Sequence, residues 1–235
     1  MWCVPVLDDE YVSRMEDVLK LYEAPYNPSE PVVCLDERPV QLLDDVRESR
    51  RVSDGSLRRD YEYRRCGTAK IFCGVEPLAG RHFTKVTPTR DRFEFAEMLQ
   101  EIAAAYPDAK RIHLVMDNLS THSKSSLLAA FDEVTANRLW KRFQPHYTPK
   151  HGSWLNQAEI AISLVSRECL GKRRLSSISA LRKELRAWKR DANRRKRTIE
   201  WRFTRRRART LFGYSTKVTP AEDCAWDLKT DDLQS

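Results

Sequence analysis

The chain has 235 residues, a formal net charge of +8 and 41% hydrophobic residues, enough for one large folded domain and too many for a disordered chain. No stretch approaches the roughly 18 apolar residues of a membrane helix, and no basic region followed by an apolar run marks a signal peptide. The six scattered cysteines form no Cys-x-x-Cys pair, so we expect a cytoplasmic protein with no zinc site or disulfide framework.

The first part of the chain predicts a helix, a strand and a hairpin of two strands. Apolar residues recur at helical spacing in the first element, and a segment with two prolines ends it. The second element is a short apolar run, typical of a buried strand, which we expect to end at Asp36. These elements cover residues 8–23, 31–36, 69–76 and 81–87.

The second part predicts a helix, a strand, a helix, a strand and two helices. Thr89 and Ser153 are the expected N-caps of two of these helices. The elements cover residues 90–105, 112–117, 123–133, 138–143, 154–170 and 177–196. This order predicts an α/β fold with a mixed sheet flanked by helices. Ligand sites in such folds gather at the carboxyl ends of strands, where we expect Asp36 and Asp117.

Three acids stand out by their positions: Asp36, Asp117 and Glu159. A carboxylate at the end of a buried strand is costly unless it is hydrogen-bonded, paired or bound to a cation. Glu159 belongs to a polar stripe on its helix with Asn156, Ser163 and Ser166. Converging carboxylates suit two Mg²⁺ ions, for which Mn²⁺ can substitute, in attack on a phosphodiester. The alternatives are turn-capping aspartates and an ordinary exposed helix glutamate.

The positive charge is concentrated near the C-terminus. Residues 165–215 hold 18 Lys and Arg against 4 Asp and Glu, a net of +14, which leaves −6 for the rest of the chain. Aromatic residues interleave with these arginines, so we expect an ordered nucleic-acid-binding segment rather than only a solvated helix face. The candidate DNA-binding residues here are Arg194, Arg195, Lys196, Arg197, Arg205, Arg206 and Arg207.

Several motifs resemble the catalytic blocks of bacterial insertion-sequence transposases in the mariner superfamily. They are Cys-Leu-Asp-Glu-Arg-Pro-Val-Gln-Leu at 34–42, Met-Asp-Asn-Leu-Ser-Thr-His at 116–122 and the segment 146–159, and the similarity runs from about residue 2 to 212. This resemblance implies an RNase H-like fold, a DDE triad of Asp36, Asp117 and Glu159, and Mg²⁺ as cofactor. It further implies DNA as partner, a TA dinucleotide target and a homodimer in synapsis.

Residues next to the three acids in the sequence are further candidates for the site. Asn118 and His122 are candidates for contacting DNA or orienting a metal-bound water, with local loop hydrogen bonding as the alternative. Lys150 and His151 are candidates for contacting phosphate. Glu37 follows Asp36 directly, but alternation along the strand points it to the opposite side, which keeps it out of the triad.

The resemblance also predicts how the chain is organised. We expect a linker helix over 1–30, a catalytic domain over 31–197, and a basic segment with an acidic tail over 198–235. Relatives carry N-terminal helix-turn-helix domains, whereas only about 30 residues precede the first strand here. We therefore expect the end-recognition region to be missing or separate.

The leading hypothesis is metal-dependent DNA strand cleavage followed by strand transfer from the freed 3′-hydroxyl. One alternative is a catalytically silent, DNA-binding transposase remnant. The other is a different RNase H-like nuclease, such as a junction resolvase or a ribonuclease H.

Overall fold

The computed structural model describes residues 7–47, 50–51, 53, 57–58 and 60–215. The acidic tail predicted at the C-terminus lies outside these residues. The two compact units of the chain divide between Trp201 and Arg202. The first unit contains the sheet and most of the helices, and the second contains α7 (Arg205–Phe212), which Thr204 caps. No helix in the described part of the chain is both long and apolar enough to cross a membrane.

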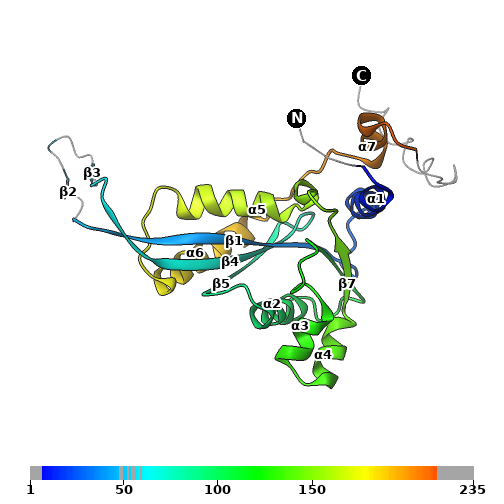
Figure 1. Cartoon of the computed structure of the whole chain (residues 1–235), viewed down its shortest axis with the longest axis horizontal. Helices are drawn as coiled ribbons and strands as arrows, with labels where there is room; N and C mark the ends of the chain where they lie inside the picture. The colour runs from blue at the N-terminus through cyan, green and yellow to red at the C-terminus, as the bar shows by residue number, and fades with distance from the viewer. Residues whose placement is uncertain (1–6, 48–49, 52, 54–56, 59, 216–235) are drawn as a thin grey trace. The chain divides into compact units, whose positions relative to one another are not determined.

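A five-stranded mixed sheet forms the centre of the first unit. Its order is β5-β4-β1-β6-β7, with β1 antiparallel to β4, β4 antiparallel to β5, and β1, β6 and β7 mutually parallel (Figure 1). The strands are β1 (Val32–Asp45), β4 (Tyr63–Glu76), β5 (Arg81–Thr87), β6 (Ile112–Met116) and β7 (Phe143–Tyr147). A separate two-stranded sheet pairs β2 (Arg50–Arg51) with β3 (Leu57–Arg58).

Helices cover both faces of the sheet, which confirms the predicted α/β class. On one face lie α2 (Arg92–Ala104), α3 (Lys124–Ala130) and α4 (Glu133–Trp140). On the other lie α5 (Ala158–Leu164), the π-helix Val165–Leu170 that continues it, and α6 (Ile178–Arg195). The N-terminal helix α1 (Asp9–Glu23) packs against the edge strand β7 and the 3₁₀ turn Ser153–Leu155.

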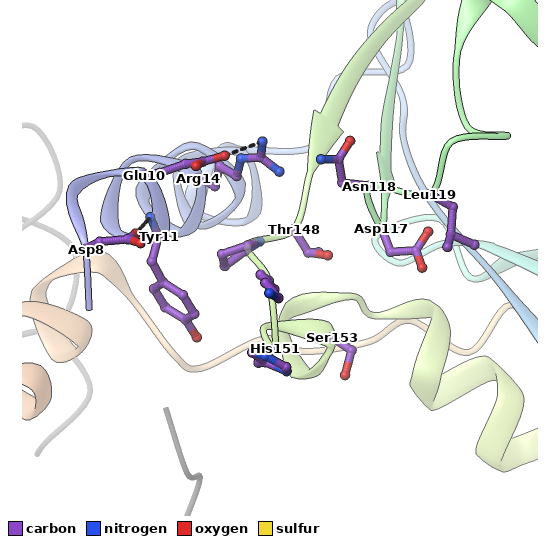
Figure 2. A pocket seen from close by; sticks show the side chains of 12 residues that line it. Asp8, Glu10, Tyr11, Arg14, Asp117, Asn118, Leu119, Thr148, His151 and Ser153 are labelled. Carbon is purple, nitrogen blue, oxygen red and sulfur yellow. Dashed lines mark hydrogen bonds and ion pairs between the residues drawn. The ribbon is translucent and has the colours of Figure 1, made fainter. Parts of the chain in front are cut away.

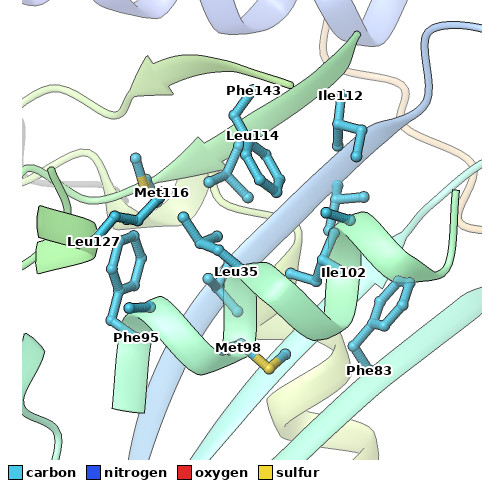
Figure 3. Close-up of a cluster of buried hydrophobic side chains, with 14 of the residues drawn as sticks. Leu35, Phe83, Phe95, Met98, Ile102, Ile112, Leu114, Met116, Leu127 and Phe143 are labelled. Atoms are coloured by element: carbon cyan, nitrogen blue, oxygen red, sulfur yellow. The ribbon is translucent and has the colours of Figure 1, made fainter. Parts of the chain in front are cut away.

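Two hydrophobic cores sandwich the sheet, because alternate residues of a strand point to opposite faces. Figure 3 shows the larger core, where Leu35 of β1 and Leu114 of β6 meet Phe95 of α2. The second core joins Ile71 of β4 to Leu185 of α6. Leu35 therefore faces α2, and its neighbour Asp36 faces the layer that contains α5.

Two predicted strand positions were wrong. β1 does not end at Asp36 but continues to Asp45, because β4 pairs with it as far as Asp45 opposite Tyr63. The strand predicted at 138–143 is mostly α4, and the true strand is 143–147. Both errors concern segments whose structure depends on distant partners rather than on their own apolar pattern.

The predicted helix boundaries also change at several capping residues. The helix predicted at 123–133 is two helices, because Asp132 accepts a hydrogen bond from the Thr135 amide and starts α4. Asp91, not Thr89, caps α2 by accepting from two amides of its first turn. Ser153 begins the 3₁₀ turn, and α5 starts only at Ala158. Ser177 caps α6 close to the predicted start.

Candidate active site

Backbone register brings Asp36 and Asp117 together. β1 and β6 are parallel, with Val33 opposite Leu114 and Cys34 opposite Val115. Continuing this register by two residues places Asp36 beside Asp117. Asp36 is therefore not at the end of its strand, as the sequence predicted, but at the point where β1 extends past the end of β6.

Asn156 ties the start of α5 to β1. Its side-chain amide donates to the Leu35 carbonyl at 2.9 Å and lies 3.5 Å from Asp36 Oδ2. Its Oδ1 accepts from the amide of Ala158, the first residue of α5, at 3.1 Å. Glu159 follows in the first turn of that helix, so Asn156 holds the segment carrying Glu159 against the strand carrying Asp36. Helical spacing assigned Asn156 to a polar stripe but did not indicate this link.

The pKa of Asp36 responds both to its burial and to the neighbouring acids. The pKa of Asp36 is raised to about 7, mainly by burial and to a smaller extent by the carboxylates of Glu159, Glu37 and Asp117, while the hydrogen bond from the Glu37 amide opposes the shift. That amide donates to Asp36 Oδ1 at 2.7 Å. Like charges that share a poorly solvated site repel each other, and a cation placed among them removes the repulsion.

His122 connects two of the four acids. Its Nε2 lies 2.8 Å from Glu37 Oε1, and its Nδ1 lies 2.7 Å from Asp117 Oδ1 and 3.2 Å from the Asp117 carbonyl. Burial lowers the pKa of His122, but hydrogen bonds with both carboxylates outweigh that effect and raise it to about 10. We call Glu37, His122 and Asp117 the His122 bridge.

The His122 bridge bears on two expectations, about Glu37 and about His122 itself. Glu37 does lie on the other side of β1 from Asp36, since its partner His122 stacks on Phe95 of the α2 core. His122 was predicted to contact DNA, but its side chain is only 1% exposed. A buried ring whose nitrogens contact the Glu37 carboxylate on one side and Asp117 on the other has no surface for DNA, so that assignment was wrong.

A cleft of about 740 Å³ opens beside Asp117. Asn118, Lys150 and His151 line it, as do Tyr11 and Arg14 from α1 (Figure 2). No pattern in the sequence indicated that α1 reaches this cleft.

Backbone geometry accounts for the shape of the loop that bounds the cleft. His151 has a positive φ of 63°. A Cβ on Gly152 would lie 2.5 Å from Pro149 Cγ, so only glycine fits there.

The basic residues predicted to bind DNA near the C-terminus lie around the end of α6 and in α7. Arg194 and Arg195 both pair with Asp191 at the end of α6, and Arg197 lies 3.1 Å from Glu168 of the π-helix. Lys196 is the left-handed cap of α6. None of these four lines the cleft beside Asp117. Residues 205–207 form the first turn of α7 in the second unit.

The acids suit a hard divalent cation by their chemistry. Carboxylate oxygens are the ligands that Mg²⁺ and Mn²⁺ prefer, and a cation would stabilise the charged form of Asp36, whose pKa is raised by burial and by the neighbouring carboxylates. Within the described residues, however, no three His, Cys, Asp or Glu side chains are arranged to hold a metal ion. Asp36, Asp117 and Glu159 are the residues that would hold such an ion.

Comparison with solved structures identifies the fold. The pre-cleavage Mos1 transpososome superposes with a TM-score of 0.55 at 12% identity over 92% of this chain and 67% of that one. The Mos1 mariner paired-end complex with Mn gives 0.52 at 14% identity over 83% and 61%. The catalytic domain of Mos1 mariner transposase gives 0.51 at 11% identity over 83% and 90%. The fold is thus the RNase H-like fold of a transposase catalytic domain.

The chain spans about three fifths of the length of the Mos1 chains in the paired-end complexes. No curated protein sequence matches it. Residues 31–182, which include all three candidate acids, match the family model described as DDE superfamily endonuclease. Because this match covers most of the chain, the protein belongs to the DDE superfamily endonucleases.

Proposed function

We propose that the chain is a transposase catalytic core that cleaves a DNA strand and joins the freed 3′-hydroxyl to target DNA. The observation that carries this proposal is the electrostatic coupling of Asp36 to Asp117 and Glu159, three acids from separate elements. Ordinary surface carboxylates avoid such crowding, whereas a phosphodiester-cleaving site requires it.

Each residue has a role in this proposal. Asp36, Asp117 and Glu159 would together hold the divalent cations. When bound, Mg²⁺ or Mn²⁺ ions stabilise the negative charge that develops during attack on the phosphodiester. Lys150, His151 and Asn118, which line the cleft beside Asp117, bind the DNA backbone and orient the strand toward the acids.

We also propose the finer features that the sequence motifs imply. These are membership of the bacterial insertion-sequence branch, a TA dinucleotide target and a homodimer during synapsis. The Mos1 structures support DNA as the partner, since they are paired-end and strand-transfer complexes.

Nicking of a supercoiled plasmid tests the proposal. We expect wild-type protein to nick with Mg²⁺ or Mn²⁺ but not with EDTA. Asp117→Asn and Glu159→Gln should abolish nicking while still binding DNA, because each removes a ligand charge and leaves the basic surfaces intact. Glu133→Gln, an exposed glutamate on α4 across the sheet, is the matched control and should nick normally. A wild-type protein that binds the plasmid but never nicks it would favour the silent remnant.

A further inference from the structure

We propose that His122 is a positioning residue that fixes Asp117 through the His122 bridge and thereby sets the affinity of the acid cluster for divalent cations. This inference rests on the proposed metal-dependent function. His122 itself touches neither cation nor DNA in this view, since its side chain is almost fully buried.

The first argument is that both ring nitrogens of His122 are engaged at short range. Nε2 lies 2.8 Å from Glu37 Oε1, and Nδ1 lies 2.7 Å from Asp117 Oδ1. The Glu37 side chain is only 4% exposed, so the far end of the bridge is anchored in the protein interior. Nδ1 also hydrogen-bonds the Asp117 carbonyl at 3.2 Å, so the ring is held against the Asp117 backbone while it makes the ion-pair contact with Oδ1. A ring placed in this way restricts the orientation of the carboxylate that it contacts.

The second argument is that the surrounding fold immobilises His122. Its ring stacks on Phe95, with centroids 4.7 Å apart and planes 25° apart, and Phe95 belongs to the larger core. Its carbonyl accepts from the Tyr147 hydroxyl at 2.8 Å, and its amide donates to the Leu119 carbonyl at 2.9 Å. The bridge therefore connects Asp117 to the rigid sheet and to α2, although Asp117 itself lies in the loop after β6.

The third argument is the asymmetry that the bridge creates in Asp117. Its Oδ1 is buried against His122, where it makes the ion-pair contact but no hydrogen bond, yet the side chain as a whole is 40% exposed and lines the cleft. One carboxylate oxygen is thus held inward while the other remains available on the cleft side. A carboxylate held in this way gives up less rotational freedom when it binds a cation.

The chain offers a matched control in His146. It too is buried, with Nδ1 2.7 Å from Asp17 Oδ2 and Nε2 2.9 Å from His113 Nδ1. Its aspartate partner belongs to α1 rather than to the acid cluster. Replacing His146 tests how the protein responds to removal of a buried histidine–aspartate hydrogen bond that does not involve Asp117.

The first test is Mn²⁺ binding without DNA, measured by electron paramagnetic resonance of the free ion. Removing a residue that orients a metal ligand typically weakens affinity about 10- to 100-fold, and we expect a decrease in that range for His122→Ala. His122→Asn keeps an amide donor near the Nδ1 position, whereas His122→Gln keeps one near Nε2. We therefore expect Asn to bind Mn²⁺ more tightly than Gln, and His146→Gln to bind as wild type does.

The second test is the Mn²⁺ dependence of plasmid nicking. The His122 variants should need more Mn²⁺ for half-maximal nicking, and saturating Mn²⁺ should recover most of the wild-type rate. Wild-type Mn²⁺ affinity in a folded His122→Ala protein, or tighter binding, would overturn the inference. If the alanine variant fails to fold, equal affinities for the Asn and Gln variants would overturn it instead. Failure of the wild-type protein to bind Mn²⁺ or to nick would reject the proposed function itself.

Discussion

At the residue scale, the candidate site depends on side chains that the sequence did not single out. Asp36, Asp117 and Glu159 were predicted from their places on strands and a helix, and the structure couples them. Asn156 and Glu37 were not assigned roles, because their partners lie far away in the sequence. A hydrogen bond such as that from Asn156 to the Leu35 carbonyl spans 121 residues, and no local pattern encodes it.

Asn156→Ala tests this link. The change leaves the buried Leu35 carbonyl without its donor and removes the acceptor for the Ala158 amide, so we expect a decrease of about 1–3 kcal/mol in the free energy of unfolding. Urea denaturation measures this change. Asn118→Ala, at an exposed position, should alter stability by no more than about 0.5 kcal/mol. Equal effects of the two substitutions would show that the Asn156 bonds contribute nothing.

At the element scale, the apolar periodicity identified most helices and strands. It gave the wrong limits for strands whose extent depends on pairing with segments far away in the sequence. β1 looked as though it ended at Asp36, since the polar residues after it resemble a loop. The antiparallel partner β4 supplies hydrogen bonds that keep this polar segment extended as far as Asp45. The position predicted for the short strand β7 was displaced for the same reason, because the limits of this strand come from its pairing with β6.

The N-terminal helix α1 is bonded to the catalytic core through Tyr22. Burial raises the pKa of Tyr22 well above its usual value, so its hydroxyl stays protonated and donates to the Leu155 carbonyl at 2.8 Å. That carbonyl belongs to the 3₁₀ turn just before Asn156. Helix α1 therefore supports the segment that carries Glu159.

Tyr22→Phe should lower the free energy of unfolding by about 1–2 kcal/mol, because it removes the donor to the Leu155 carbonyl and the weaker contact with Cys34 Sγ at 3.3 Å. Tyr26→Phe, at a side chain that is 52% exposed, is the control and should have almost no effect. Thermal or urea unfolding of both variants makes the comparison. An unchanged Tyr22→Phe protein would mean that α1 is not held through this bond.

At the scale of the whole molecule, the uneven charge predicts how DNA binding responds to salt. The basic residues divide between the end of α6 in the first unit and α7 in the second. Each lysine or arginine that binds a phosphate releases counterions, so the logarithm of affinity falls with the logarithm of salt by about 0.9 per neutralised phosphate.

Glutamine substitutions should show which of the two groups of basic residues, at the end of α6 or in α7, contacts DNA. We expect replacement of Arg194, Arg195, Lys196 and Arg197, or of Arg205, Arg206 and Arg207, to flatten the salt slope by about 0.9 for each phosphate that is no longer neutralised. Fluorescence anisotropy of a labelled duplex at several salt concentrations measures the slope. A group whose replacement leaves the slope unchanged lies outside the DNA interface, and circular dichroism confirms that each variant is folded.

The parallel pairing of β1 with β6 has a consequence for the cell that makes this protein. Asp36 and Asp117 become neighbours only when β6 has been synthesised and has closed against β1, and Glu159 arrives later still with α5. A growing chain on the ribosome therefore lacks an assembled acid cluster until most of it has emerged. A fragment that ends before Glu159 contains only part of the cluster.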